Sequence, residues 1–135
     1  METVIFTVTK WEEQPIENNL SSFPINTAKV EYEIKGVLEG KATLEYLLYY
    51  LDSHMEDAEK AKSKIAGFLH FEGHYDGKYG SFTACENGMF DNGTLDSPAQ
   101  IINGTGELET LIGSYNYYFL GHTSEMVLDF ELMKV

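Results

Sequence analysis

Two glutamates stand among apolar residues, where a carboxyl group is suited to proton transfer or to binding a polar group of a ligand. Glu45 lies in the run Leu44–Leu51, which also contains four leucines and three tyrosines. Phe82, Ala84 and Glu86 occupy every second position, which predicts that their side chains share one face of a strand. Removal of water raises the pKa of a carboxyl group, and two buried carboxyl groups that face each other are typical of an acid/base pair. The alternative is a structural carboxylate, paired with a tyrosine hydroxyl or a lysine.

Aromatic residues supply the other candidates for ligand binding. Tyr115 and Tyr117 alternate onto one face of a strand, and their rings and hydroxyl groups suit a flat, partly polar ligand, although such residues also fill cores. Trp11 stands beside two glutamates and is expected at a strand end at the mouth of the fold, either as a plug or as a lip for a ligand. The predicted ligand-binding residues are Trp11, Glu45, Phe82, Glu86, Tyr115 and Tyr117.

Histidine and cysteine offer weaker signals. His70, Glu72 and His74 have the spacing of two imidazoles and a carboxylate on one strand face, which could hold a metal. The alternating positions Leu69 and Phe71 are far more apolar, so we predict that the trio faces outward and binds no metal; a polar interior would invert this assignment. No nucleophile arrangement surrounds the single cysteine, no cofactor is predicted, and no catalytic residue is assigned.

The elements that must position these residues are strands. Hydrophobic residues alternate with polar or charged ones in the segments Val4–Val8, Val30–Ile34 and Met126–Leu132, which indicates strands with one buried face. Pro98 predicts a sheet edge, a bulge or a break. Four pairs of residues favour tight turns between strands. These pairs are Asp76-Gly77, Asn87-Gly88, Asn92-Gly93 and Asn103-Gly104.

Seven or eight hairpin-linked strands are compatible with a sandwich or a closed barrel. Closure removes exposed sheet edges, and at about eight strands the interior holds side chains or one small ligand. The capping-box spacing of Ser53–Glu56 and the following residues predict a short helical or loop insertion near residues 53–62. The 135 residues are expected to form a single domain, residues 1–135.

Composition restricts the partners. The chain carries 22 acidic residues against 9 lysines and arginines, a net charge of −13, which argues against nucleic acid and anionic membranes. One cysteine fits a reducing compartment, and Met1–Lys10 lacks the pattern of an export signal, so we expect a cytoplasmic protein.

The order and spacing of several short motifs resemble a family of small bacterial proteins of unknown function, itself similar to the allene oxide cyclase and dirigent barrels. The resemblance covers Val4 to Leu132. It implies an all-β fold, a single eight-stranded antiparallel barrel, and no established activity. The motifs are Gly104-Thr105-Gly106-Glu107-Leu108 with Leu111 and Gly113, Trp11, Gly36–Gly40, Glu45-Tyr46-Leu47, Gly80-Ser81-Phe82 and Leu128-Asp129-Phe130.

Three functions stay open on these observations. The first is a barrel that binds a modest hydrophobic or aromatic small molecule. The second is a cyclase or isomerase of the allene oxide cyclase kind, in which Glu45 or Glu86 assists the reaction. The third is a structural or interaction module filled by its own aromatics. Because both faces of Leu44–Leu51 are largely apolar, this strand is also expected to form a homo-oligomer contact, in a dimer.

Overall fold

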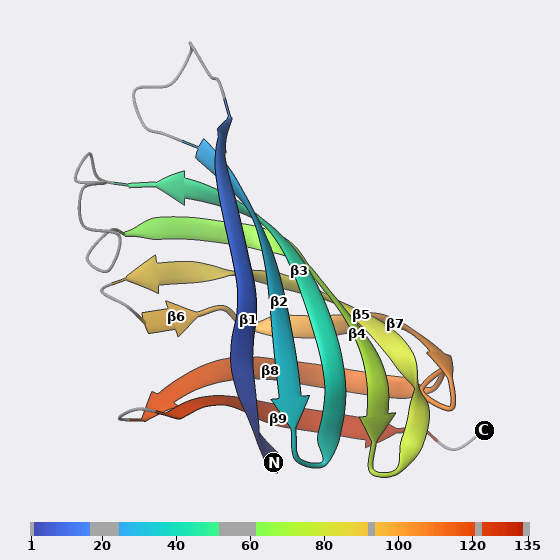
Figure 1. Ribbon diagram of the computed structural model, residues 1–135. Coiled ribbons are helices and arrows are strands. Elements are labelled where there is room, and N and C mark those ends of the chain that lie inside the picture. The colour runs from blue at the N-terminus through green and yellow to red at the C-terminus, as the bar shows by residue number, and fades with distance from the viewer. Residues whose placement is uncertain (1, 17–24, 52–61, 92–93, 121–122, 134–135) are drawn as a thin grey trace.

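The computed structural model describes residues 2–16, 25–51, 62–91, 94–120 and 123–133, and these residues form strands and turns (Figure 1). The strands are β1 (Glu2–Ile16), β2 (Ile25–Lys35), β3 (Leu38–Tyr50), β4 (Ser63–Tyr75), β5 (Lys78–Asp91), β6 (Thr94–Asp96), β7 (Ala99–Gly106), β8 (Leu111–Leu120) and β9 (Thr123–Leu132). The predicted all-β class is confirmed. The insertion predicted near residues 53–62 falls on positions 52–61, which lie outside the described residues.

All nine strands belong to one antiparallel, ring-like sheet. β1 to β5 pair in chain order, β5 continues to β7, β8 and β9, and β9 pairs back onto β1. β6 has three residues and pairs with β5. The resemblance implies eight strands, whereas the described residues form nine, because the segment from Thr94 to Gly106 is divided into β6 and β7. Ser97 and Pro98 interrupt it, since proline has no N–H to donate to the ladder, and the break at Pro98 is confirmed.

The core follows the predicted alternation. Val30, Tyr32 and Ile34 of β2 are at most 3% exposed, as are Met126 and Leu128 of β9, and all face the interior of the ring. Apolar side chains that point inward from every side lose their contact with water together, which is the main favourable contribution to folding.

Two of the predicted turn pairs illustrate different uses of glycine. Asp76 and Gly77 join β4 to β5 as predicted, and both have positive φ, of 51° and 79°. Asn87 and Gly88, by contrast, lie inside β5, so the turn predicted there is wrong. A Cβ on Gly88 would lie 2.0 Å from the carbonyl oxygen of Asp96, which shows that close approach of β6 explains this glycine. Asn103 and Gly104 likewise lie inside β7.

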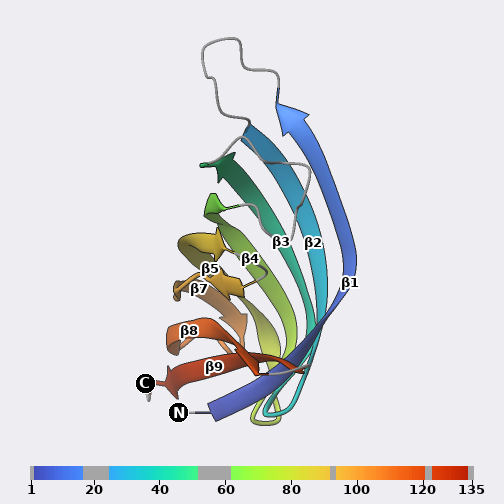
Figure 2. The same cartoon turned by 90° about the vertical axis from the view of Figure 1, so that its left-hand side faces the viewer.

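A bulge in β1 determines what faces the interior at one end of the ring. The register of β1 against β2 shifts between Val8 and Lys10. Beyond the shift Trp11 pairs with Val30 and Glu13 with Ala28, and both partners are buried. β1 pairs with β9 over residues 2–5 alone, and Figure 2 shows how strongly it curves along its length. We had expected Trp11 at the end of a strand, but it lies within the long strand β1.

Candidate functional site

A row of inward-facing residues crosses the sheet at the level of Glu86. In the ladder Tyr46 of β3 pairs with Gly67 of β4, Gly67 pairs with Glu86 of β5, Glu86 with Ala99 of β7, and Ala99 with Tyr115 of β8. Large and small residues thus alternate along the row. Because the residues between them are small, the side chains of Tyr46, Glu86 and Tyr115 can converge inside the ring.

Three tyrosine hydroxyl groups donate hydrogen bonds to the Glu86 carboxyl group, which is 0% exposed. Tyr46 Oη lies 2.6 Å from Oε1 and Tyr117 Oη lies 2.6 Å from Oε2, which also accepts a bond from Tyr115. Tyr46 Oη and Tyr117 Oη are 3.3 Å apart. We call Glu86, Tyr46, Tyr115 and Tyr117 the Glu86 cluster. Such a network is stable in a dry interior because its polar atoms have partners.

Burial dominates the electrostatics of the Glu86 cluster. Loss of water raises the pKa of the Glu86 carboxyl group above its ordinary 4.5, and the hydrogen bonds from Tyr115, Tyr117 and Tyr46 oppose this rise. Burial also raises the pKa of all three tyrosines well above 10.0, and the nearby carboxyl group adds to it. The tyrosines therefore stay neutral donors at any physiological pH.

A cavity of about 350 Å³, partly open to solvent, lies next to the Glu86 cluster, and we call it the interior cavity. Tyr46 lines the cavity and also donates to Glu86, whereas the carboxyl group itself does not line it. The cavity lies where β1 departs from β9, between Val8 and Trp11 on one side and Ser124 on the other. The described residues around it are mostly aromatic or aliphatic: Phe6, Val8, Trp11, Tyr32, Tyr46, Leu48, Tyr50, Ile65, Phe90 and Leu95, with Glu13, Ser63 and Ser124.

A second carboxyl group meets this cavity directly. Glu13 accepts hydrogen bonds from Trp11 Nε1 (3.2 Å), from Tyr50 Oη (2.6 Å) and from the side-chain amide of Asn26. Asn26 is 6% exposed, and its Oδ1 is buried without a partner among the described residues. We call Glu13, Trp11, Tyr50 and Asn26 the Glu13 cluster. Both of its carboxyl oxygens act as acceptors.

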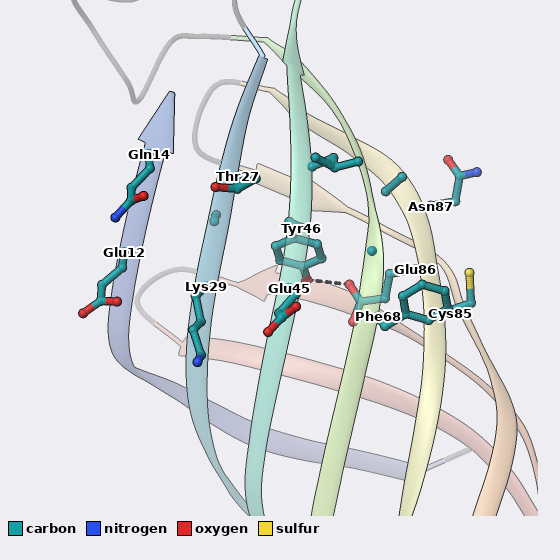
Figure 3. A pocket seen from close by; sticks show the side chains of 14 residues that line it. Glu12, Gln14, Thr27, Lys29, Glu45, Tyr46, Phe68, Cys85, Glu86 and Asn87 are labelled. Atoms are coloured by element: carbon teal, nitrogen blue, oxygen red, sulfur yellow. Dashed lines mark hydrogen bonds between the residues drawn. The ribbon is translucent and has the colours of Figure 1, made fainter. Parts of the chain in front are cut away.

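Glu45 lies elsewhere than expected. It is exposed and points outward, because its neighbour Tyr46 takes the inward position of β3. Glu45 lines a groove of about 620 Å³ on the outer face of β1 to β5, together with Lys29 and Phe68 (Figure 3). Tyr46 and Glu86 also contribute to the lining of this groove, and Figure 3 shows the hydrogen bond between them as a dashed line. Within a single copy of the chain Glu45 is therefore not desolvated, and it lies on the opposite face of the sheet from the Glu86 side chain.

The remaining predicted residues divide between site and core. Tyr115 and Tyr117 join Glu86 as described, and Trp11 borders the cavity while 47% exposed, in the position of a lip. Phe82 is buried but distant from the cavity lining. Its ring stacks on Phe71 with centroids 4.9 Å apart and meets the edge of Phe130 at 5.6 Å. Phe82 therefore belongs to the core.

The outward assignment of the histidines is confirmed. His70, Glu72 and His74 are all exposed, with His70 Nδ1 3.2 Å from Thr83 Oγ1 and Glu72 bonded to the hydroxyl group of Tyr79. Across the described residues, no group of three or more histidine, cysteine, aspartate or glutamate side chains is arranged to hold a metal ion. Cys85 is exposed on the outer face.

Several residues of the site are not among those predicted from spacing, including Glu13, Asn26, Tyr32, Tyr46 and Tyr50. Tyr46 and Tyr50 alternate with Glu45 in an apolar run, and attention to strand parity would have selected them in its place. Tyr32 was identified as inward-facing but not as a cavity residue. Glu13 could not have been found by parity, because the bulge in β1 reverses it.

Fold and site together define an all-β protein whose ring-like sheet encloses a buried carboxyl–tyrosine cluster beside an interior cavity. The model of a family described as a protein of unknown function (DUF3224) matches residues 3–132, so the chain belongs to the DUF3224 family. The crystal structure of a DUF3224 protein of unknown function from Shewanella oneidensis MR-1 is similar to it. That match has 17% sequence identity and a TM-score of 0.75, and covers 99% of this chain and 97% of the other.

This structural likeness shows the fold, which is the same along almost the whole chain. A comparison with curated proteins found no match. In the described part of the chain, no helix has the length and apolar character needed to cross a membrane.

Proposed function

We propose that the protein binds one modest, largely apolar or aromatic small molecule in its interior cavity. The observation that supports this proposal is the cavity itself, whose volume of about 350 Å³ lies above the lower limit of roughly 300 Å³ for ligand pockets. The ring-like sheet has nine strands, of which β6 has three residues. At this strand number an interior accommodates one small ligand.

The arrangement of polar groups favours binding over catalysis. A catalytic acid or base must come within hydrogen-bond distance of the reacting atom. Glu86 has the raised pKa expected of such a group, but Tyr46 lies between it and the cavity. The hydrogen bond to Glu86 therefore holds the Tyr46 side chain in place, where it can contact a ligand in the cavity.

The cavity also favours binding over a purely structural role. A module without a ligand gains stability when its own side chains fill its interior, since an empty cavity costs about 20 cal/mol per Å² of its surface. In this chain Phe71, Phe82 and Phe130 fill the far end of the ring, whereas the end near Trp11 keeps its cavity.

Fluorescence of Trp11, the one tryptophan of the chain, reports on the cavity. We expect phenethyl alcohol to change this fluorescence saturably and to raise the melting temperature. Leu48→Phe fills the cavity from β3 and should weaken binding at least tenfold, about 1.4 kcal/mol. Leu47→Phe, on the outward face of the same strand, is the matched control. Equal binding by both variants, or none by the native chain, would contradict the proposal.

We further propose that the protein is cytoplasmic and that a second copy covers the outer groove. Leu47 and Phe68 are 51% and 55% exposed on adjacent strands of this groove, so together they form an apolar patch. Lys29 and Glu45 supply charges of both signs beside them, so two copies related by a two-fold axis could pair opposite charges around an apolar centre.

A further inference from the structure

We propose that the ligand of the interior cavity is an organic cation, an apolar or aromatic amine whose ammonium group binds at Glu13. This inference rests on the proposed binding function and names the chemical class of its ligand. It depends on the charge of the cavity lining, on the aromatic faces around it and on the unused acceptors of the Glu13 cluster.

The charge of the lining has one sign. Among the described residues that line the cavity, Glu13 is the one with an ordinarily charged side chain, and none is lysine, arginine or histidine. The ion pair found among the described residues joins Lys10 to Glu12 at 3.3 Å, so Glu13 has no cationic partner there. Glu13 is half-buried, so water screens its charge less than that of an exposed carboxylate, and the charge attracts a cation.

The apolar part of the lining suits a cation as well. The faces of aromatic rings carry negative charge density and attract ammonium groups, most strongly for tryptophan. Trp11 and Tyr50 meet Glu13 through the donor groups at the edges of their rings, and both residues also line the cavity. The six aromatic residues of the lining are Phe6, Trp11, Tyr32, Tyr46, Tyr50 and Phe90.

Unused hydrogen-bond capacity lies next to the carboxylate. Asn26 donates its amide to Glu13, while its buried Oδ1 accepts nothing from the described residues. A carboxylate has about four acceptor positions, and the Glu13 cluster fills three of them. An ammonium group brings three donors and no acceptor, which complements this surplus of acceptors. A ligand carboxylate would instead face a like charge without a donor from a cationic side chain.

The experiment compares three probes of nearly equal size that differ in charge: phenethylamine, phenethyl alcohol and hydrocinnamate. Binding to the full chain is measured by calorimetry at neutral pH. We expect the amine to bind at least about tenfold more tightly than the alcohol, and hydrocinnamate to bind most weakly. Glu13→Gln keeps the size of the side chain and should remove this preference. Glu12→Gln, the adjacent outward residue, should keep it.

The outcomes separate this inference from the proposed function. Equal affinity for amine and alcohol, tightest binding of hydrocinnamate, or an unchanged preference in Glu13→Gln would overturn the cation inference and leave the proposed binding function in place. Absence of binding by all three probes would overturn both. Should Glu13→Gln fail to fold, the order of the three affinities in the native protein decides the matter.

Discussion

The phenol oxygen of Tyr46 on β3 lies 2.6 Å from a carboxyl oxygen of Glu86 on β5, although β4 runs between the two strands. The contact is possible because Gly67, which pairs with both residues, has no side chain in the intervening position. A glycine that appears unremarkable in the sequence thus permits a buried hydrogen bond across three strands.

Replacement of Gly67 is expected to disturb this contact. In Gly67→Ala the new Cβ would lie 2.1 Å from the carbonyl oxygen of Glu45 and 2.8 Å from Cδ1 of Tyr46. Because the first of these is a backbone atom, the strands must move apart, and we expect a loss of about 1–3 kcal/mol in the free energy of unfolding. Chemical denaturation measures it. Ala66→Ser, on the exposed face next to it, should cost less than about 0.5 kcal/mol, and equal effects of the two changes would refute the explanation.

Glu86→Gln should change how stability depends on pH. The folded state raises the pKa of Glu86 above 4.5, so between the unfolded and folded pKa values the folded protein binds more protons. The contribution of Glu86 to stability is therefore present at low pH and is lost as pH rises through the folded pKa. The native chain should lose stability relative to Glu86→Gln over this window, with a slope of at most about 1.4 kcal/mol per pH unit. Parallel denaturation profiles of the two proteins would show that the pKa of Glu86 is not raised.

Tyr115→Phe should move the pKa of Glu86 further upward. The hydroxyl group of Tyr115 donates to Glu86 Oε2, and this bond opposes the effect of burial. Titration of the labelled carboxyl carbons by NMR, assigned with Glu86→Gln, measures the shift. Tyr118→Phe, at an exposed position of the same strand, is the control and should leave the titration unchanged. A lower pKa in Tyr115→Phe would mean that the hydroxyl group serves as an acceptor.

If a second copy covers the outer groove, the protein should form a concentration-dependent dimer. Phe68→Lys should convert it to a monomer in sedimentation experiments, because a lysine in the apolar centre of an interface must lose its water without a partner. Ile112→Lys introduces the same charge at a position of similar exposure, 47% against 55%, on β8. If the native chain sediments as a monomer, the groove is not a contact between copies.

Strand parity explains how much of this site could be predicted. Alternation correctly placed Glu86, Tyr115 and Tyr117 on the inner face, because uninterrupted strands keep a period of two residues. The same rule would have placed Glu45 outside. The expectation for Glu45 was loss of water and not a particular face, since both faces of β3 carry large side chains in this segment.

Other features could not be read from a local pattern. The bulge between Val8 and Lys10 brings Glu13 to the cavity, and it depends on pairing with β2, some twenty residues further along the chain. The role of Gly67 likewise depends on the register of three strands. The break at Pro98 was predictable because proline lacks a donor, whereas Asn87-Gly88 carried a turn signal that close contact with β6 explains instead.

The most direct test of the interior binding site is a crystal structure of the protein with para-bromophenethyl alcohol, in which bromine supplies an anomalous signal. We predict one dominant bromine peak inside the ring, bordered by Trp11, Tyr32 and Leu48, with the Glu86 cluster unchanged beneath it. An interior filled by protein side chains, or bromine peaks confined to the outer face, would contradict the existence of this site.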